Sequence, residues 1–195
     1  MVETITPGVL GRRRYPVALF LHTLGAGASG AVTGALLGGI GWLLGAPWGA
    51  PGYVALACVA ALYFVREAAG VPVPLPQLRR QVPEWWRRFY SPETAAALYG
   101  AGLGVGFLTY LSFGTYAAVA TGAFVSGSVP FGAAACGMFG VTRAAAAAVG
   151  AGARDEEEAA RIADRLGTMG GGGWPRAVNA GALAAVAAAS VARLP

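Results

Sequence analysis

The chain has 195 residues, of which 56% are hydrophobic and only 12% charged, and its formal net charge is +5. Soluble domains usually contain about 25% charged residues, so this composition excludes an ordinary soluble protein and indicates an integral membrane protein. The 14 basic residues are all Arg, and they flank apolar runs in groups. That grouping favours a role in membrane topology and argues against nucleic-acid binding.

The sequence lacks the residue sets that common catalytic sites need. His22 is the only His, and the two Cys, Cys58 and Cys136, lie inside apolar stretches, so no His/Cys cluster can hold zinc. No nucleophile–base pair and no phosphate-binding loop is recognisable. We therefore expect no metal, no cofactor and no activity of the kind found in soluble enzymes.

The first half of the chain predicts two membrane spans. Residues 1–15 form a short polar segment that ends in Arg12, Arg13 and Arg14. An apolar run over 17–44 follows, then an uncharged turn over 45–52, and a second run from Tyr53 that reaches span length only if it continues to Gly70.

The loop over residues 71–93 is expected to lie at the membrane surface. Pro72, Pro74, Pro76 and Pro83 forbid one long helix in this loop. Arg and Trp side chains alternate in it, a mixture that suits the lipid headgroup region. The interface anchors that we predict here are Arg79, Arg80, Trp85, Trp86, Arg87 and Arg88.

A helix start is predicted at Ser91, followed by Pro92 and Glu93. The apolar run over 94–125 would be roughly 48 Å long as one helix, whereas the hydrocarbon core is about 30 Å thick. We expect this run to tilt, kink or fold back, with a break at Gly114 that would free backbone groups for a ligand.

The last part of the chain predicts an uncharged turn over 126–128 and a fourth span over 129–150. A short amphipathic polar helix over 154–167 comes next, with Gly167 as its stop. An Ala-rich final span over 175–193 is the least apolar of the five. The predicted fold is therefore all-α: a polytopic bundle of about five spans in a single membrane domain, residues 1–195.

The Arg groups predict the topology. If those at 12–14, 66, 79–88 and 154–176 face the cytoplasm, five spans place the N-terminus inside and the C-terminus outside the cell (inner) membrane. A hairpin in the third run would give six spans instead. The blocks 17–70 and 94–150 look alike, which predicts an internal repeat of the kind common in transporters.

Small residues recur at helical spacing in both blocks. Gly30, Gly34 and Gly38 in the first, and Gly100 and Gly104 in the second, would place small residues on one helix face and let helices approach closely.

Polar residues at membrane depth are the candidate functional residues. Thr109, Ser112, Thr115 and Tyr116 can share one helical sector, where their hydroxyls either bond nearby backbone carbonyls or line a substrate path. His22 is a functional candidate in the first span or, alternatively, a hydrogen-bonded residue of the bundle. We expect Arg66 and Arg143 to extend to the inner surface, and Glu67 to pair with one of them.

The Gly-rich run from Gly100 to Tyr110 and the sequence Phe139-Gly-Val-Thr-Arg143 resemble the membrane domain of CcdA/DsbD-like thiol-electron carriers, in the wider superfamily of LysE-type exporters. The resemblance implies a Cys pair that carries reducing equivalents across the membrane, here Cys58 and Cys136. The chain lacks the family's Cys-Pro elements.

Three functions fit these observations. The first is a small-solute transporter or permease-like protein whose path is lined by Thr109, Ser112, Thr115, Tyr116 and His22. The second is a thiol-redox carrier that uses Cys58 and Cys136. The third is a non-catalytic membrane subunit or assembly factor that docks a membrane or soluble protein partner through residues 79–90 or 155–166. The expected partners are the lipid bilayer and such a protein, with no nucleic acid.

Overall fold

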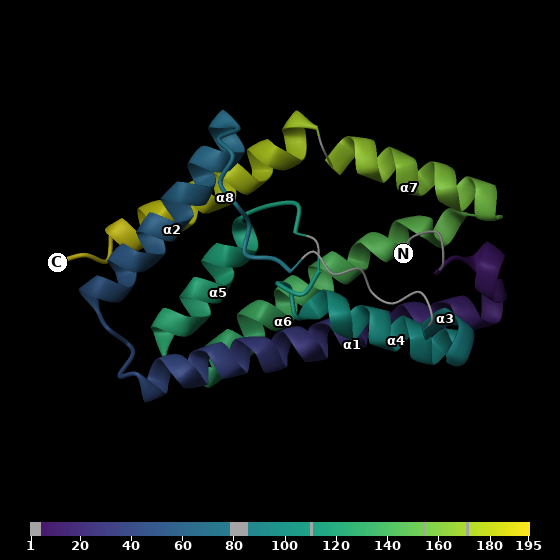
Figure 1. Cartoon of the computed structure of the whole chain (residues 1–195), viewed down its shortest axis with the longest axis horizontal. Coiled ribbons are helices and arrows are strands. Elements are labelled where there is room, and N and C mark those ends of the chain that lie inside the picture. The colour runs from purple at the N-terminus through teal and green to yellow at the C-terminus, as the bar shows by residue number, and fades with distance from the viewer. Residues whose placement is uncertain (1–4, 79–85, 110, 154, 171) are drawn as a thin grey trace.

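The computed structural model describes residues 5–78, 86–109, 111–153, 155–170 and 172–195 (Figure 1). All regular elements within these ranges are helical, as the sequence predicts. They are α1 (Pro7–Leu43), α2 (Ala50–Ala69), α3 (Trp86–Phe89), α4 (Pro92–Gly104), α5 (Thr115–Ser126), α6 (Val129–Ala145), the 3-10 helix η1 (Ala146–Gly152), α7 (Glu156–Gly170) and α8 (Gly173–Val191).

Three helical stretches are long and apolar enough to cross a membrane: Arg13–Leu43, Ala50–Ala69 and Val129–Gly152. They coincide with the first, second and fourth predicted spans. The third predicted span is divided, and α5 is only a shorter apolar helix. The final predicted span forms α8, which does not meet the same criteria of length and apolarity. The fold supports a membrane-associated helical protein, and three of the five expected spans meet these criteria.

Helix α1 is the long element against which α4, α5 and α6 pack (Figure 1). Its contact with α6 is antiparallel, because Gly30 meets Cys136 whereas Gly38 meets Ser128. A Cβ atom at Gly34 would overlap the carbonyl oxygen of Gly132. Two backbones that approach this closely leave no room for side chains, so small residues are required here.

The helices begin and end differently from the sequence prediction at several places, among them the starts of α1 and α2 and the end of α7. Helix α1 starts at Pro7, so it includes most of the segment predicted as a polar extension, and it bends at Gly11, where φ is 75°. Helix α7 continues through the predicted stop at Gly167 to Gly170. At the start of α4 the prediction is correct, since the Ser91 side chain accepts a hydrogen bond from the Thr94 N–H (3.2 Å).

The overlong third run is interrupted between Gly104 and Thr115. Both halves run in the same direction as α1: Gly100 packs on His22, Gly104 on Ala26, and Phe124 near the end of α5 reaches Gly41. The run is therefore one interrupted helix and not the hairpin considered as the alternative. Because the segment between Gly104 and Thr115 is not helical, the two helical parts are each shorter than the single helix that would be too long for one span.

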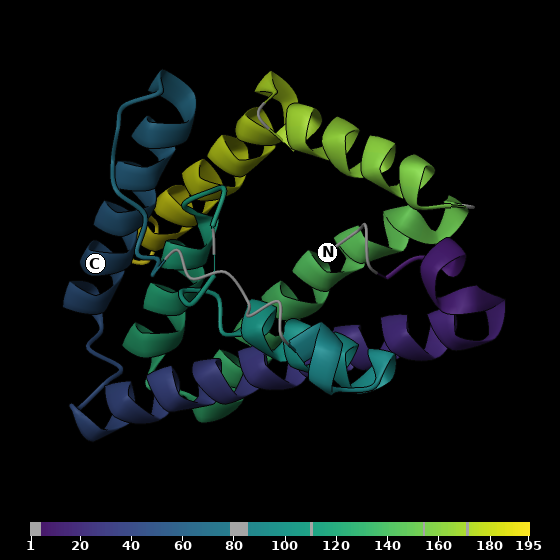
Figure 2. The same cartoon turned by 45° about the vertical axis from the view of Figure 1, so that its right-hand side comes forward.

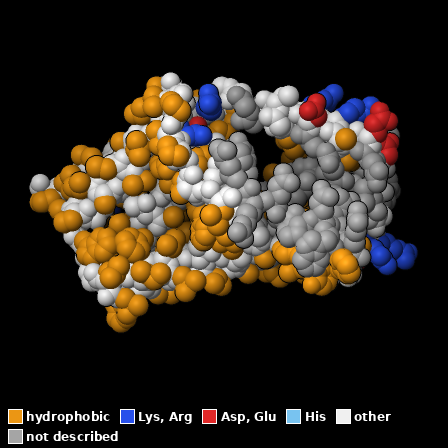
Figure 3. All heavy atoms as spheres, viewed as in Figure 1, with side chains coloured by type: hydrophobic (Ala, Val, Ile, Leu, Met, Phe, Trp, Pro, Cys, Tyr) orange, Lys and Arg blue, Asp and Glu red, His pale blue; other side chains and the backbone are white. Residues whose placement is uncertain are grey.

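Helices α2 and α8 pack on each other and on α5, away from α1 (Figure 2). In Figure 3, hydrophobic side chains cover the left part and the lower edge of the molecule. Charged side chains gather toward the top and the right, where α7 lies. Large exposed apolar side chains such as Phe20, Leu36 and Trp42 on α1 form part of the uncharged surface, as expected for helices that face lipid.

Candidate functional site: a polar junction at the interrupted helix

The interruption over residues 105–114 frees backbone groups that a continuous helix would pair internally. Such groups need other partners where they are buried away from water. The Pro-rich segment over 71–78 supplies two of them. The Leu78 N–H donates to the Phe107 carbonyl (2.8 Å), and the Gln77 side chain accepts from the Leu111 N–H (2.5 Å). The two non-helical segments therefore stabilise each other.

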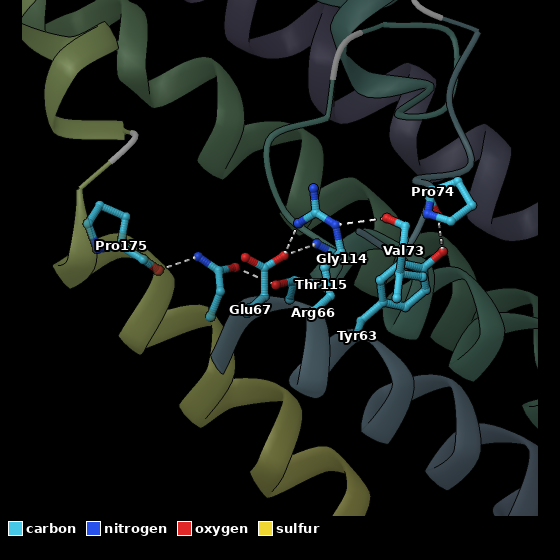
Figure 4. Close-up of polar contacts among 9 residues, drawn as sticks. Tyr63, Arg66, Glu67, Val73, Pro74, Gly114, Thr115 and Pro175 are labelled. Carbon is cyan, nitrogen blue, oxygen red and sulfur yellow. Dashed lines mark hydrogen bonds and ion pairs between the residues drawn. The ribbon is translucent and has the colours of Figure 1, made fainter. Parts of the chain in front are cut away.

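A buried carboxylate at the end of α2 contacts the same interruption. The Glu67 side chain is 1% exposed, and its Oε1 accepts hydrogen bonds from the Arg66 guanidinium and from the Gly114 N–H (3.1 Å) (Figure 4). Arg66 also donates to the Val73 carbonyl (3.0 Å). The expected pairing of Glu67 with one of the two arginines is thus confirmed for Arg66.

The second carboxylate oxygen of Glu67, Oε2, is buried without a hydrogen-bond partner among the described residues. Glu67 also lines an open cleft of about 680 Å³ between the end of α2 and the start of α8, with Arg176 on the opposite wall. Burying a carboxylate oxygen without a hydrogen-bond partner costs free energy. The ion pair with Arg66 and the hydrogen bond from the Gly114 N–H, both on Oε1, offset that cost and hold the Glu67 side chain in place.

Arg143 of α6, which we expected to extend to the inner membrane surface, turns to the end of α4. Its Nη1 donates to the Leu103 carbonyl (3.1 Å) and to the Thr109 hydroxyl (3.2 Å). The guanidinium also lies over the Phe139 ring, 5.9 Å from its centre. A cation near the last carbonyls of a helix is favourable, and here it holds the end of α4 beside the interruption.

Two of the residues predicted to line a substrate path, Thr109 and Tyr116, help to hold the end of α4 beside the interruption. Thr109 is buried, and its hydroxyl donates to the Gly106 carbonyl (3.3 Å). The Tyr116 hydroxyl donates to the Val105 carbonyl (2.8 Å), and its ring packs on Phe139. Both hydroxyls therefore bond backbone carbonyls, the structural alternative that the sequence left open.

The other two path residues, Ser112 and Thr115, line an open cleft of about 330 Å³. The Thr115 hydroxyl donates to Asn179 Oδ1 of α8, and Asn179 Nδ2 donates to the Pro175 carbonyl (2.8 Å) (Figure 4). Thr142 and Arg143 of α6 complete the polar lining, and the rings of Phe113 and Phe139 are its aromatic part. We call this hollow the Arg143 cleft.

His22 lies apart from the Arg143 cleft. It is fully buried between α1 and α4, where its Nδ1 is 3.2 Å from the Ala96 carbonyl oxygen and its Nε2 has no partner among the described residues. Cys58 is exposed and Cys136 is buried, and both are free thiols. Of the predicted interface anchors, Arg79, Arg80 and Trp85 lie outside the described residues, as do the side chains of Arg87 and Arg88. Trp86 packs edge-on against Tyr99 of α4.

Sequence reasoning predicted the break at Gly114 but missed how Gln77 and Asn179 contribute to the junction. The charged members could have been found from the sequence, since Glu67 is an ionisable residue at the end of an apolar run and Arg143 is one inside an apolar run. Asn179 is likewise an isolated amide in an Ala-rich stretch. Which of these would meet could not be inferred, because they come from separate segments of the chain.

Comparison with known proteins gives one consistent group of relatives. The chain is 33% identical over 137 residues to the Methylamine utilization protein MauF of Methylophilus methylotrophus, covering 70% of this chain and 48% of that protein. It is 36% identical over 108 residues to MauF of Paracoccus denitrificans, covering 52% and 39% of the two chains. No protein-family model and no solved structure matches the chain.

The resemblance to CcdA/DsbD-like carriers and LysE-type exporters is therefore wrong, because the relatives carry the name MauF. That resemblance rested on Gly-rich helices, and glycine at helical spacing serves close packing in membrane helices of many kinds. The relatives' names mention no transport. The chain is thus similar to MauF methylamine utilization proteins and spans about half the length of the relatives that it matches.

Proposed function

We propose that this chain is a membrane-associated accessory protein of methylamine utilization. The observation that carries the proposal is the similarity to MauF over 70% of the chain. The three apolar helical stretches support its location in a membrane. The described residues contain no group of three or more His, Cys, Asp or Glu side chains that could hold a metal ion. An accessory role requires no chemistry from the chain itself.

A growth experiment tests this function. The gene is disrupted in its own host, and growth is measured on methylamine as the sole carbon source and, as a control, on succinate with ammonium. We expect the disrupted strain to lose growth on methylamine only, and the intact gene to restore it. Normal growth of the disrupted strain on methylamine would contradict the proposal.

We also propose that the N-terminus faces the cytoplasm and that the chain crosses the inner membrane five times, with α4 and α5 together as one crossing. On the face shown in Figure 3 the charged side chains lie toward the top and the right and leave the left part and the lower edge hydrophobic, which supports this topology. A reporter fused before residue 1 should be active only inside the cell, and one fused after residue 195 only outside. Reporter activity on the same side at both ends would indicate an even number of crossings.

Within this function, helix α7 is our candidate for contact with a protein partner. Among the described elements, η1 is the main neighbour of α7. Met169 is exposed on it, whereas Ala159 is buried. Photo-crosslinking from a reactive residue at position 169 should capture one defined protein in methylamine-grown cells, and the same residue at position 36 on α1 should not. Equal capture from both positions would argue against α7 as the docking helix.

A further inference from the structure

A further open cleft, of about 490 Å³, lies at one end of the molecule, where α2 and α6 begin and where α5 and α8 end (Figure 1). Two stretches that are long and apolar enough to cross a membrane, Ala50–Ala69 and Val129–Gly152, both begin there. The cleft therefore lies where the hydrocarbon core of a bilayer would meet the lipid headgroups. We call this hollow the Arg193 cleft.

Tryptophan side chains at the same end of the molecule support this level in the membrane. Trp42, near the end of α1, is 65% exposed. Trp48, in the turn before α2, packs edge-on against Phe124 near the end of α5, with 5.3 Å between the ring centroids. Tryptophan is enriched where hydrocarbon meets headgroups. The end that carries the cleft therefore has the composition of a membrane–water interface.

The walls of the Arg193 cleft are mainly apolar. Each of the four helices around it contributes an apolar side chain: Leu56 of α2, Val125 of α5, Phe131 of α6 and Val186 of α8. Three serine hydroxyls also line the cleft, but each is hydrogen-bonded to a backbone group close by in the chain: Ser126, Ser128 and Ser190. The walls therefore suit a hydrocarbon chain better than a polar solute.

Two polar side chains of the lining have no partner among the described residues: the Arg193 guanidinium and the Tyr53 hydroxyl. Arg193 is exposed and takes part in none of the ion pairs found in the described ranges. The segments that build this end of the molecule, residues 15–66, 94–153 and 177–195, contain no Asp or Glu. No acidic side chain at this end therefore offsets the charge of Arg193.

The size of the cleft and its two free donors determine the class of occupant. One turn of an α-helix with its side chains fills roughly 400–600 Å³, so the cleft is too small for a membrane span of a partner protein. A flexible acyl chain can fill an apolar hollow of this size. A guanidinium and a hydroxyl are hydrogen-bond donors that match the oxygens of a phosphate.

We propose that the Arg193 cleft binds one anionic phospholipid. Its acyl chain lies along Leu56, Val125 and Val186, and its phosphate accepts hydrogen bonds from Arg193 and Tyr53. This inference goes beyond the proposed function and does not depend on it, because it needs only that the chain lies in a membrane.

The test is a titration of the purified full chain in detergent micelles, with native mass spectrometry to count bound lipids. Dioleoylphosphatidylglycerol is the anionic probe, and dioleoylphosphatidylcholine, whose choline balances the phosphate charge, is the comparison. We expect one phosphatidylglycerol to bind several-fold more tightly than phosphatidylcholine. An excess of glycerol 3-phosphate should not displace it, because that molecule lacks the acyl chain.

Two variants separate the headgroup contact from the chain contact. Arg193→Gln should weaken phosphatidylglycerol binding about tenfold or more, because a hydrogen bond to a charged group is lost, and should change phosphatidylcholine binding less. Arg161→Gln is its control, since it removes one positive charge from an exposed position on α7, away from the cleft, and should leave binding unchanged.

Gly122→Leu fills the cleft and leaves Arg193 in place. A Cβ atom at Gly122 meets only the Leu56 side chain, at 3.9 Å, so a larger side chain can enter without a backbone clash. This variant should lose the site for both lipids. Gly181→Leu is its control, because a Cβ there meets nothing within 4 Å and Gly181 lines the other cleft, beside Glu67. The helical circular dichroism signal should be the same for all four variants.

Three results would overturn the proposal. The first is equal binding of the two lipids, or no saturable binding of phosphatidylglycerol, by the unmodified chain. The second is an equal loss of affinity in Arg161→Gln and Arg193→Gln, which would indicate attraction by overall charge. The third is undiminished phosphatidylglycerol binding by Gly122→Leu, which would place the lipid elsewhere on the protein.

Discussion

The contact of α1 with α6 and the polar junction around the interrupted helix both hold separate segments of the chain together, but through different interactions. In the first region, two unbroken helices approach until Gly34 and Gly132 touch through their backbones. The second region interrupts a helix between Gly104 and Thr115, where Gln77 and Glu67 accept two of the freed N–H groups and Arg143 binds the end of α4. Close packing needs only small residues at regular spacing, whereas the junction needs particular side chains from four separate segments.

The largest loss of stability is expected at the buried ion pair of the junction. Glu67→Leu leaves Arg66 unpaired and removes the acceptor of the Gly114 N–H, so the free energy of unfolding should fall by about 3–5 kcal/mol. Unfolding in mixed micelles measures this. Glu67→Gln retains an oxygen for Gly114 and should cost less, about 1–3 kcal/mol. If the Leu variant were no less stable than the Gln variant, the polar contacts of Glu67 would not be what stabilises the junction.

The next largest effect tests the close-packed region. A methyl group at Gly34 would overlap the Gly132 carbonyl, so Gly34→Ala should reduce the free energy of unfolding by about 1–3 kcal/mol. Gly39→Ala is the matched control on the same helix, because a Cβ there meets only the Val129 side chain at 3.6 Å. It should be neutral or stabilising by up to about 1 kcal/mol, since Ala favours helix more than Gly. Equal losses at both positions would contradict backbone contact as the cause.

A smaller effect is expected at the start of α4. Ser91→Ala removes the side chain that accepts from the Thr94 N–H, and loss of such a cap costs about 1 kcal/mol. The measurement is again the unfolding free energy, with Thr168→Ala as a control, because the Thr168 hydroxyl only donates to a carbonyl in its own helix. If Ser91→Ala lost less unfolding free energy than Thr168→Ala, packing and not the Ser91 cap would hold the start of α4.

The smallest effect is expected outside both regions, on α7. Glu157 and Arg161 form an exposed pair at 3.8 Å, and exposed pairs at this spacing contribute about 0.3–0.5 kcal/mol. Glu157→Gln should therefore change the unfolding free energy little, and less still at high salt. A loss of unfolding free energy comparable to that of Glu67→Gln would show that the difference in exposure between the two ion pairs does not determine how much each contributes to stability.

The sequence by itself determined the helical class and the packing glycines' spacing, and it predicted that the run over 94–125 is too long for one straight span. Each of these follows from composition or from periods of a few residues along the chain, which local physics sets. Only the tertiary structure decided that the break spans residues 105–114, that Gln77 and Glu67 satisfy it, and that Arg143 turns inward to it. Those partners lie 34 to 47 residues away along the chain, and their choice depends on how whole helices pack.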